Sequence, residues 1–406
     1  MARTPTHVLT INGGSSSVKF ALFACDDDRA PARVLGGALT GIGSSQAMLT
    51  TDVADRKERV TLAGPPPTHA AAAAQVLAWL EPKLDGRPLA AIAHRVVHGG
   101  ERFQKATRLS PDVVDDLRAL VPLAPNHLPD EIALIDAFAR AKPDTPHVAC
   151  FDTAFHRTLP RVSFTMPVPA TPGLRRYGFH GLSFAYLVSA LDSIAGRDAA
   201  RGRLILAHLG NGASMAAVRD GRCVDTTMGL TPTGGLTMST RAGDLDPGVV
   251  VYLARQHGLT IDQLDEWLTQ RSGLAAISGG TSDMQELLAR ESADPRARLA
   301  VDIFCARVRQ WIGAFSATLG GLDTIVFTAG VGEHAPAIRR RACEGLDFLG
   351  VTINTAANDA NAPVISTASS RVTVRVIPTD EALMMARETI ALLTKKDRHV
   401  SDVSTP

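Results

Sequence analysis

Two charged residues, Arg95 and Asp152, lie in or directly after apolar, strand-like runs and could take part in ligand binding or catalysis. Arg95 lies within the apolar run 91–97, where a guanidinium needs an anionic partner or ligand. Asp152 follows the apolar run 147–151, and carboxylates at the carboxyl end of a strand are often catalytic or associated with a metal. Arg95 could equally form a structural ion pair, and Asp152 could cap a helix. These residues alone leave both alternatives open.

Two further candidates lie in loops. His180 stands between two glycines in RRYGFHG (175–181), which is typical of a side chain directed at a ligand, although single loop histidines also occur on ordinary surfaces. Arg241 lies in DTTMGLTPTGGLTMSTRAGDLDP (225–247), a stretch without helical period. Long irregular loops of this kind are often functional. The alternative for Arg241 is a surface ion pair with one of the two aspartates that follow it.

The stretch INGGSSSVKF (11–20) has the composition of a phosphate-binding loop but not the P-loop pattern. That pattern needs Gly, four residues, Gly-Lys and then Ser or Thr, whereas counting from Gly13 gives Val18 and Phe20 at the two critical positions. The flanking VLTI and VKFALF predict strand, turn, strand. Such a hairpin could offer amides and hydroxyls to a phosphate, or it could be an ordinary tight hairpin.

The same pattern recurs further along the chain. LILAHLGNGASMAAV (204–218) is again an apolar run, a small-residue turn and a second apolar run, and TIVFTAGVGE (324–333) also ends in glycines. Glycine allows a backbone to approach a phosphate or purine closely. Each segment alone is an ordinary turn, but together they indicate a duplicated α/β domain with a ligand in the cleft between the copies.

The elements that must position these residues alternate along the chain. Strand-like runs at Val8–Ile11, Ala91–Val97, His147–Phe151, Leu204–Leu209 and Thr324–Thr328 alternate with helix-like runs at His69–Leu80, Pro129–Ala141 and Arg296–Leu319. This alternation predicts an α/β protein.

Composition excludes several classes of function. The 406 residues suit about two domains, and 45% hydrophobic residues with a net charge of +1 give no electrostatic preference for nucleic acid or membrane. The first ten residues lack an apolar signal core and AAAAQVLAWL is too short to span a bilayer. We therefore expect a cytoplasmic protein. The five dispersed cysteines indicate neither a disulfide framework nor a zinc site.

Taken together, the motifs resemble those of the acetate kinase family, whose fold belongs with actin, hexokinase and the heat-shock chaperone ATPases. Eight segments carry the resemblance in order: INGGSSSVKF, HRVVHGGERF, FDTAFH, RRYGFHG, AHLGNGAS, TRAGDLDP, TAGVGEH and IPTDEALMMA. The resemblance implies an α/β fold of two duplicated actin- or ribonuclease-H-like domains with a nucleotide cleft between them. The first would span residues 1–150, completed by a C-terminal helix at 386–406, and the second residues 151–385.

Carried over residue by residue, the resemblance implies roles for the candidate positions. Asn12 and Glu381 would place Mg²⁺ or Mn²⁺. Asp152, His180 and Arg241 would be catalytic, and Arg95 would bind the substrate carboxylate beside an acyl pocket of Val97, Asn126, Phe179 and Pro232. ATP or ADP would contact Lys19, His208, Leu209, Gly210, Asn211, Gly212, Asp283, Met284, Gln285, Gly330, Val331, Gly332, Glu333 and His334. Family members pack as homodimers, so a second copy is the expected protein partner.

The implied activity is a reversible, direct in-line transfer of the ATP γ-phosphate to acetate, giving acetyl phosphate and ADP. A kinase for propionate or another short carboxylate is the close alternative. An actin-like or chaperone-like ATP-dependent binding module is a more distant one. Arg95, His180 and Arg241 argue against that module, because ATP hydrolysis by water needs no clamp for a carboxylate.

The chain departs from the family pattern at four positions. Asn126 precedes the histidine of the LAP-x-H motif, where a hydrophobic residue is usual. Leu182 and Phe184 replace Thr and His in the usual GFHGTSH, and Gln285 stands where an arginine is common. The first three departures concern the acyl pocket and the fourth concerns the adenosine side of the nucleotide.

Asn126 generates a prediction about substrate choice. One buried methylene is worth only about 0.8 kcal/mol, so such a pocket separates acetate from propionate by shape more than by attraction. The amide adds polarity with little change in volume from leucine. We expect acetate to be preferred over propionate, with a high KM that Asn126→Leu lowers. Steady-state kinetics with both acids checks this, and a higher kcat/KM for propionate or butyrate would contradict it.

Overall fold

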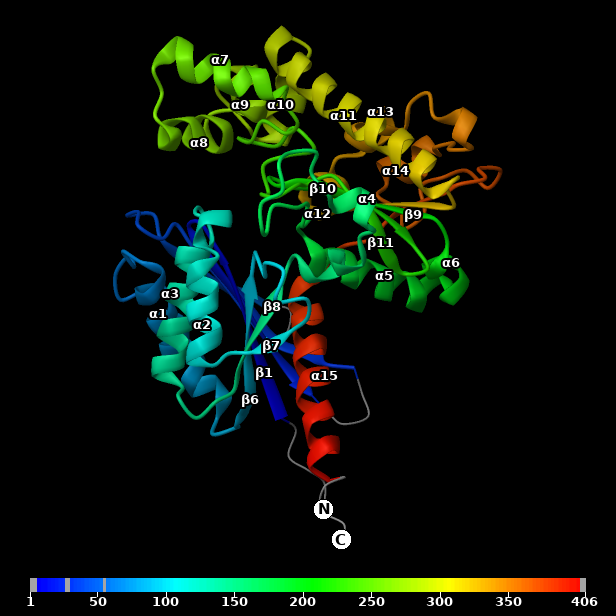
Figure 1. Ribbon diagram of the computed structural model, residues 1–406. Helices are drawn as coiled ribbons and strands as arrows, with labels where there is room; N and C mark the ends of the chain where they lie inside the picture. Colours follow the sequence, from blue (N-terminus) through cyan, green and yellow to red (C-terminus); the bar gives the residue numbers. More distant parts are fainter. Residues whose placement is uncertain (1–5, 26–29, 54–55, 402–406) are drawn as a thin grey trace. The chain divides into compact units, whose positions relative to one another are not determined.

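The computed structural model describes residues 6–25, 30–53 and 56–401 (Figure 1). Its internal contacts divide the chain into unit 1, residues 1–154 and 380–406, and unit 2, residues 155–379. Residues 1–5 of the expected first domain and 402–406 of its expected last helix lie outside the described residues. The domain boundaries expected at 150 and 385 stay a prediction.

Unit 1 is built on a sheet of eight strands in the order β5-β4-β3-β2-β1-β6-β8-β7. The strands are β1 (Thr6–Gly14), β2 (Ser17–Cys25), β3 (Ala32–Thr40), β4 (Met48–Val53), β5 (Arg56–Val60), β6 (Leu89–Val96), β7 (Thr107–Arg108) and β8 (His147–Phe151). β1 and β2 form an antiparallel hairpin in which Gly14 pairs with Ser17. β6 is parallel to β1, and β8 is parallel to β6. The carboxyl ends of these three parallel strands therefore lie at one edge of the sheet.

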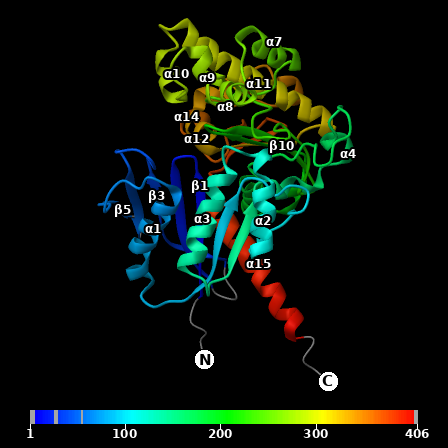
Figure 2. The same cartoon turned by 60° about the vertical axis from the view of Figure 1, so that its left-hand side comes forward.

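Helices cover both faces of this sheet. They are α1 (His69–Leu84), α2 (Pro111–Ala119), α3 (Leu128–Ala141) and α15 (Glu381–Ser401), with a 3₁₀ turn η1 (Val121–Leu123). The helices α1 and α3 pack on one face, where Val76 and Leu80 join Leu22 and Phe138 in a buried cluster. On the other face α15 runs along β1, β6 and β8, as both views show (Figures 1 and 2). The C-terminal segment thus completes the core that the first 154 residues begin.

Unit 2 repeats the central part of this topology. Its strands are β9 (Leu204–Leu209), β10 (Ala213–Arg219), β11 (Arg222–Thr226), β12 (Thr324–Thr328) and β13 (Thr373–Val376), in the order β11-β10-β9-β12-β13. β9, β10 and β11 are antiparallel, whereas β12 and β13 continue in parallel from β9. The order of β3-β2-β1-β6-β8 in unit 1 is the same, with the same directions. The expected duplication of an α/β domain is confirmed.

Helices connect the strands of unit 2, and several of them pack against its sheet. They are α4 (Arg161–Phe164), α5 (Gly181–Ala195), α6 (Arg197–Arg201), α7 (Pro247–His257), α8 (Ile261–Gln270), α9 (Gly273–Ser278), α10 (Met284–Arg290), α11 (Pro295–Leu319), α12 (Ala329–His334), α13 (Pro336–Cys343) and α14 (Thr355–Asp359), with a 3₁₀ turn η3 (Asp347–Leu349). A further 3₁₀ turn, η2 (Ala154–Thr158), begins at a residue of unit 1 and continues into unit 2. Leu187 and Leu191 of α5 bury themselves against Leu206 and Val218. The long helix α11 packs against β9 and β10.

Most expected elements are confirmed, with two corrections. Both Gly/Ser segments 11–20 and 204–218 are hairpins, and residues 227–246 contain neither helix nor strand. The glycines after β12, however, form the short helix α12 rather than a turn, and α14 interrupts the connection expected at 356–370. Among the described residues, no helix combines the length and apolar character needed to cross a bilayer.

Candidate active site

Arg95 on β6 and Asp152 just beyond β8 form a buried ion pair in unit 1. Arg95 Nη2 donates to Asp152 Oδ2 at 2.5 Å, and Arg95 Nε donates to the same oxygen at 3.1 Å. The side chain of Asp152 is 1% exposed and that of Arg95 is 14% exposed. Burial alone would lower the pKa of Arg95, but the neighbouring carboxylates, Asp152 foremost, raise it. The ion pair that the sequence left open is therefore present.

Asn12 and Glu381, the expected metal-binding residues, lie beside this pair. Arg95 Nη1 donates to Asn12 Oδ1 at 3.3 Å, and Asn12 Nδ2 donates to Glu381 Oε2 at 3.3 Å. Both side chains are half-buried and supply the oxygen ligands that Mg²⁺ prefers, so the residues fit the ion. No cluster of three His, Cys, Asp or Glu side chains that could hold a metal occurs within the described residues. A magnesium ion here would therefore take its other ligands from phosphate and water.

Glu131, in the first turn of α3, is a third buried carboxyl group near Arg95. Its Oε2 accepts a hydrogen bond from the Val97 amide at 2.9 Å, and its Oε1 lies 3.8 Å from Arg95 Nη1. The residue is 3% exposed, and Oε1 makes no hydrogen bond to any described residue. Burial raises the pKa of Glu131 to about 7, although Arg95 and the Val97 amide act in the opposite direction.

In unit 2, His180 is held by backbone geometry and by ring stacking. It precedes α5 with a φ of 56°, in the left-handed region, which is uncommon for residues other than glycine and frequent at functional sites. Its ring stacks on that of His208 with centroids 4.1 Å apart. The Nδ1 atoms of His180 and His208 bond to the hydroxyls of Ser214 at 2.8 Å and Ser183 at 2.9 Å. These contacts fix the orientation of both rings.

Arg241 and His180 converge on the hairpin between β9 and β10. A Cβ built on Gly212 would lie 3.3 Å from His180 Nε2 and 3.7 Å from Arg241 Nη1. Only a residue without a side chain leaves this space open beside both nitrogen groups. Arg241 Nη1 also donates to the Pro232 carbonyl at 3.0 Å, which anchors the half-buried guanidinium to its own loop.

The loop that carries Arg241 is tied to neighbouring backbone. The Ser239 amide donates to the Asn211 carbonyl at 3.2 Å, and the Leu274 amide donates to the Met238 carbonyl at 2.9 Å. Gly273 has a φ of 65°, and a Cβ there would lie 2.2 Å from the Met238 carbonyl oxygen. The two aspartates after Arg241 accept backbone hydrogen bonds, Asp244 from Gly235 and Asp246 from Gly248. The irregular loop is therefore a fixed structure.

The expected nucleotide segment 330–334 forms most of α12. Within it, Glu333 Oε1 accepts hydrogen bonds from the Ala329 amide at 2.7 Å and the Thr379 amide at 3.3 Å. Nothing described lies within 4 Å of a Cβ built on Gly330, so the backbone is open there. His334 is exposed. Glu333 thus stabilises the conformation of the segment by accepting backbone hydrogen bonds, while Gly330 leaves room for a ligand.

The remaining nucleotide candidates occupy three different environments. Asp283 caps α10 by accepting from the Glu286 amide at 2.9 Å, which is a structural use of its carboxylate. Met284 is buried, and Gln285 is exposed. In unit 1, the exposed Lys19 pairs across the β1–β2 hairpin with Asn12.

The four expected acyl-pocket residues are divided between the units. In unit 1, Val97 is buried, and Asn126 is exposed in the turn before α3. In unit 2, Phe179 is buried, and its carbonyl accepts a hydrogen bond from His156 Nε2 at 2.9 Å. The carbonyl of Pro232 accepts a hydrogen bond from Arg241 Nη1.

Arg339 on α13 is a fully buried cation that donates hydrogen bonds to carbonyl and side-chain amide oxygens of described residues. Its Nη1 donates at 2.9 Å to the carbonyls of both Gly332 and Glu333. Its Nε and Nη2 donate to the side chain and carbonyl of Asn358, and Nη2 also donates to Asn361 Oδ1. Arg339 therefore holds the carboxyl end of the glycine-rich segment in place, even though burial lowers its pKa.

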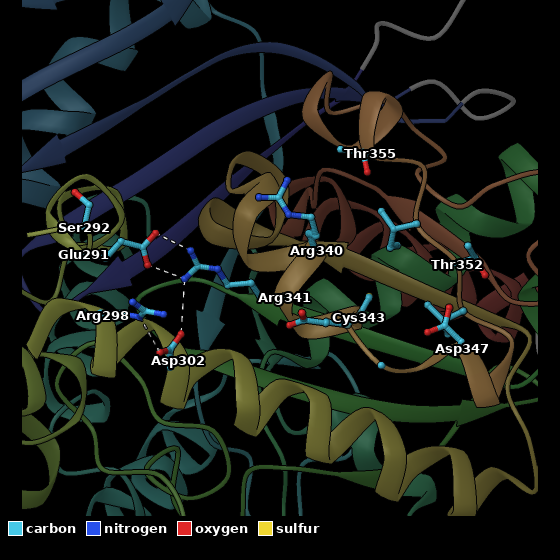
Figure 3. A pocket seen from close by; sticks show the side chains of 14 residues that line it. Glu291, Ser292, Arg298, Asp302, Arg340, Arg341, Cys343, Asp347, Thr352 and Thr355 are labelled. Atoms are coloured by element: carbon cyan, nitrogen blue, oxygen red, sulfur yellow. Dashed lines mark hydrogen bonds and ion pairs between the residues drawn. The ribbon is translucent and has the colours of Figure 1, made fainter. Parts of the chain in front are cut away.

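A groove of about 750 Å³ in unit 2 is separate from these residues (Figure 3). Its lining comes from the end of α10, from α11 and α13, and from the segment that follows α13. At one end Arg341 pairs with Glu291 through two hydrogen bonds of 2.6 and 2.7 Å. None of the expected site residues lines the groove, so it is not the candidate active site.

Sequence reasoning missed Glu131, Arg339 and the hydroxyl groups of Ser183 and Ser214. Glu131 stands in DEIAL, at the start of a helix, where an acidic residue is expected because it interacts favourably with the helix dipole. Arg339 is one of three successive arginines, of which the next two are partly exposed. Ser214 could have been found from the small-residue turn at 210–214, since the hairpin places it next to the glycines.

Comparison with known proteins identifies the family. The sequence profile of the Acetokinase family matches residues 7–387. An acetate kinase from Rhodopseudomonas palustris is 43% identical over 388 residues, which make up 94% of this chain and 96% of that protein.

Solved structures agree with this match. The crystal structure of Porphyromonas gingivalis acetate kinase has a TM-score of 0.85 at 35% identity and covers 96% of this chain and 100% of that one. A propionate kinase from Francisella tularensis has a TM-score of 0.87 at 33% identity, with 94% and 98% covered. The fold is therefore the duplicated actin-like α/β fold expected from the sequence.

The contacts of Arg339 generate a prediction about stability. Arg339→Met removes the donors of several buried carbonyl groups, each costing about 1–3 kcal/mol when left unpaired. We expect the free energy of unfolding to fall by at least about 3 kcal/mol, and the KM for ATP to rise because the glycine segment loosens. The matched control is Arg340→Met, which removes only an exposed pair with Asp359. Urea denaturation of both variants measures the difference, and equal losses would contradict the assignment.

Proposed function

We propose that this chain, which belongs to the Acetokinase family, transfers the γ-phosphate of ATP to acetate and gives acetyl phosphate and ADP. The observation that supports this most is the convergence of His180 and Arg241 on the glycine hairpin at Gly212. In such a place two side chains can stabilise a phosphoryl group while glycine leaves it room. The proposed reaction is ATP-dependent and belongs in the cytoplasm.

The chemistry explains why these residue types suffice. A carboxylate substrate has a pKa of about 4 to 5 and is already ionised at neutral pH, so the reaction needs no general base. The obstacle is repulsion between this anion and the negatively charged γ-phosphate. Cations held in fixed geometry remove that obstacle, because they are positioned before the charge develops.

Each cationic residue has a separate proposed role. Arg95 binds the substrate carboxylate, and Asp152 orients Arg95 through the bidentate pair. His180 and Arg241 act on the phosphoryl group during transfer. A carboxylate oxygen of the acid forms a bond to the γ-phosphorus while the bond to the β,γ-bridging oxygen breaks, and that oxygen leaves as part of ADP. A phosphorylated enzyme is unnecessary, because the substrate carboxylate is itself a sufficient nucleophile.

Asn12 and Glu381 would hold Mg²⁺, which when bound neutralises charge on the nucleotide phosphates. Lys19 lies across the hairpin from Asn12 and supplies a further cation for these phosphates. The amides around Gly210–Gly212 and Gly330 offer backbone that a nucleotide can approach closely.

Acetate rather than propionate is the finer part of the proposal. Relatives with either name share this fold at similar identity, so the choice depends on the acyl pocket. Phe184 packs in the core of unit 2 with Leu187 and Leu206, so the preference for acetate rests on Asn126, whose amide adds polarity without opening room for a longer acyl chain. An ATPase-driven binding module remains the less favoured candidate, because it would leave Arg95 and Arg241 without a carboxyl substrate.

A direct assay tests the proposed reaction. The purified chain is incubated with MgATP and either acetate or propionate, and the acyl phosphate is trapped with hydroxylamine as the hydroxamate. We expect hydroxamate from both acids and more from acetate. ADP formation that is independent of any acid would favour the ATPase alternative, and no reaction with either acid would overturn the proposal.

Arg241 gives the sharpest mutational prediction. Because cationic groups in phosphoryl transfer are worth about 10³ to 10⁵ in rate, Arg241→Ala should lower kcat at least about 10³-fold with a modest change in the KM for ATP. Arg307→Ala on α11 is the control, since that exposed arginine bonds Gln310 of its own helix and lies outside the proposed site and the proposed interface. A loss below tenfold for Arg241→Ala would remove this residue from the transfer step.

A second copy of the chain is the proposed protein partner. No side chain within α7 or α8 is buried, although both helices carry large apolar residues. Tyr252 is 63% exposed and Ile261 is 86% exposed. Apolar residues gathered in this way often mark a protein interface.

The dimer makes a prediction about mass in solution. Light scattering should give twice the 42.9 kDa of one chain. Tyr252→Glu combined with Ile261→Glu should yield monomers, because buried charges without partners destabilise an interface. Phe348→Glu, at another exposed apolar position, should leave the mass unchanged. A monomeric wild-type chain would refute the proposed partner.

A further inference from the structure

The proposed transfer leaves the carboxyl group of Glu131 without a role. This group is 3% exposed, and its Oε1 accepts no hydrogen bond from any described residue. Such atoms are rare in native structures because an unsatisfied buried polar atom is costly. Oε1 lies 3.8 Å from Arg95 Nη1, so its position is tied to the residue proposed to bind the substrate.

Glu131 competes with the substrate for part of the Arg95 guanidinium. Of the five N–H groups of an arginine, Asp152 accepts from Nε and Nη2, and Asn12 accepts from Nη1. One N–H on Nη1 and one on Nη2 are left for a further anion. Glu131 Oε1 is the carboxyl oxygen near Nη1, outside hydrogen-bonding distance. An ionised Glu131 and an incoming carboxylate would therefore face the same donor.

The surrounding charges disfavour two carboxylates at once. Arg95 from β6 faces Asp152 from beyond β8, Glu131 from α3 and Glu381 from α15. Other titratable groups around α3 include Asp130 on its own first turn, which pairs with His69 of α1, and Asp136, which pairs with Arg118 of α2. His127 stands at the N-terminus of α3, and the His94 ring of β6 contacts Phe138 of this helix. One guanidinium thus already offsets three carboxyl groups before the substrate carboxylate arrives.

We propose that Glu131 is a positioning residue that takes up one proton when the substrate acid binds, because only its neutral form leaves the Arg95 guanidinium to the substrate carboxylate. This inference rests on the proposed function and names the condition under which its acid substrate binds. The proton comes from solvent, stays on Glu131 during the transfer and returns to solvent as the product leaves. It takes no part in breaking or forming the bonds to phosphorus.

The direction of the effect follows from the titration of Glu131. Its pKa of about 7 in the free protein places the change within the neutral range. Between pH 6 and pH 8 the protonated fraction of such a group falls about tenfold, so the KM for acetate should rise about tenfold. The KM for acetyl phosphate should change little in the same range, because its acyl group carries no carboxylate.

The experiment measures the KM for acetate at saturating MgATP from pH 6 to pH 8, in wild type and in Glu131→Gln. Gln keeps an acceptor for the Val97 amide but cannot take up the proton. We expect a flat profile for Glu131→Gln, with kcat within a few-fold of wild type. The matched control, Asp136→Asn on the same helix, should keep the wild-type slope. Titration of ATP affects all three proteins equally and cancels in the comparison.

A measurement on the wild-type protein alone guards against a variant that fails to fold. Acetate is titrated into the protein with MgADP in two buffers of different ionisation enthalpy, and calorimetry gives the protons taken up. We expect about 0.9 proton per acetate at pH 8 and about 0.1 at pH 6, from the same titration curve.

The outcomes separate this inference from the proposed function. Parallel profiles for wild type and Glu131→Gln, or no proton uptake at pH 8, would overturn the role of Glu131 while acetate phosphorylation stands. If neither acetate nor propionate is phosphorylated at any pH, the proposed function itself fails. A slope in the KM for acetyl phosphate equal to that for acetate would also refute the competition for Arg95.

Discussion

The ion pair between Arg95 and Asp152 is the interaction on which the candidate residues of unit 1 depend. Breaking a buried pair by removing one partner costs about 3–5 kcal/mol, because the other charge is left uncompensated. The pair joins the carboxyl ends of β6 and β8, and Arg95 also contacts Asn12 of β1 and approaches Glu131 of α3. The position of this cation is therefore a property of the whole unit and not of one flexible side chain.

In unit 2, the position of the Arg241 guanidinium is determined in a different way. Arg241 lies on a loop without regular structure, so backbone contacts take the place of a sheet. The left-handed backbone at His180 and Gly273, and the absence of a side chain at Gly212, determine where the loop and hairpin lie. The strain of a non-glycine residue at positive φ costs about 1–3 kcal/mol, which the stacking on His208 and the packed α5 help to offset.

The sequence predicts the strands and hairpins well because buried parallel strands are short, continuous apolar runs. Thus β8, β9 and β12 have the bounds expected from HVACF, LILAHL and TIVFT. It fails at α12, since AGVGEH contains too few large residues to show a helical period. Glu131 and Arg339 were missed for a related reason: a charged residue in a helix usually faces water, and only the tertiary structure reveals that these two are buried.

The same limit applies to the candidate site. The order of the motifs identifies the candidate residues, but it gives no information on hydrogen bonds between segments that are far apart in the sequence. The contacts of Arg95 with Asp152, of His180 with Ser214 and of Thr379 with Ser183 join segments separated by 57, 34 and 196 residues. Such partners can be predicted only once the sheet order is known.

The position of α15 in the chain has a consequence for synthesis on the ribosome. Met385, Ala386 and Thr389 of this helix are fully buried, and the Cys150 thiol lies 3.8 Å from the Met385 carbonyl. All of unit 2 is made before α15, so one apolar face of the first sheet waits for its cover until more than 220 further residues have been translated. The nascent chain therefore exposes an aggregation-prone apolar surface while unit 2 is being synthesised. A chaperone that shields β1, β6 and β8 would be needed until α15 has been translated.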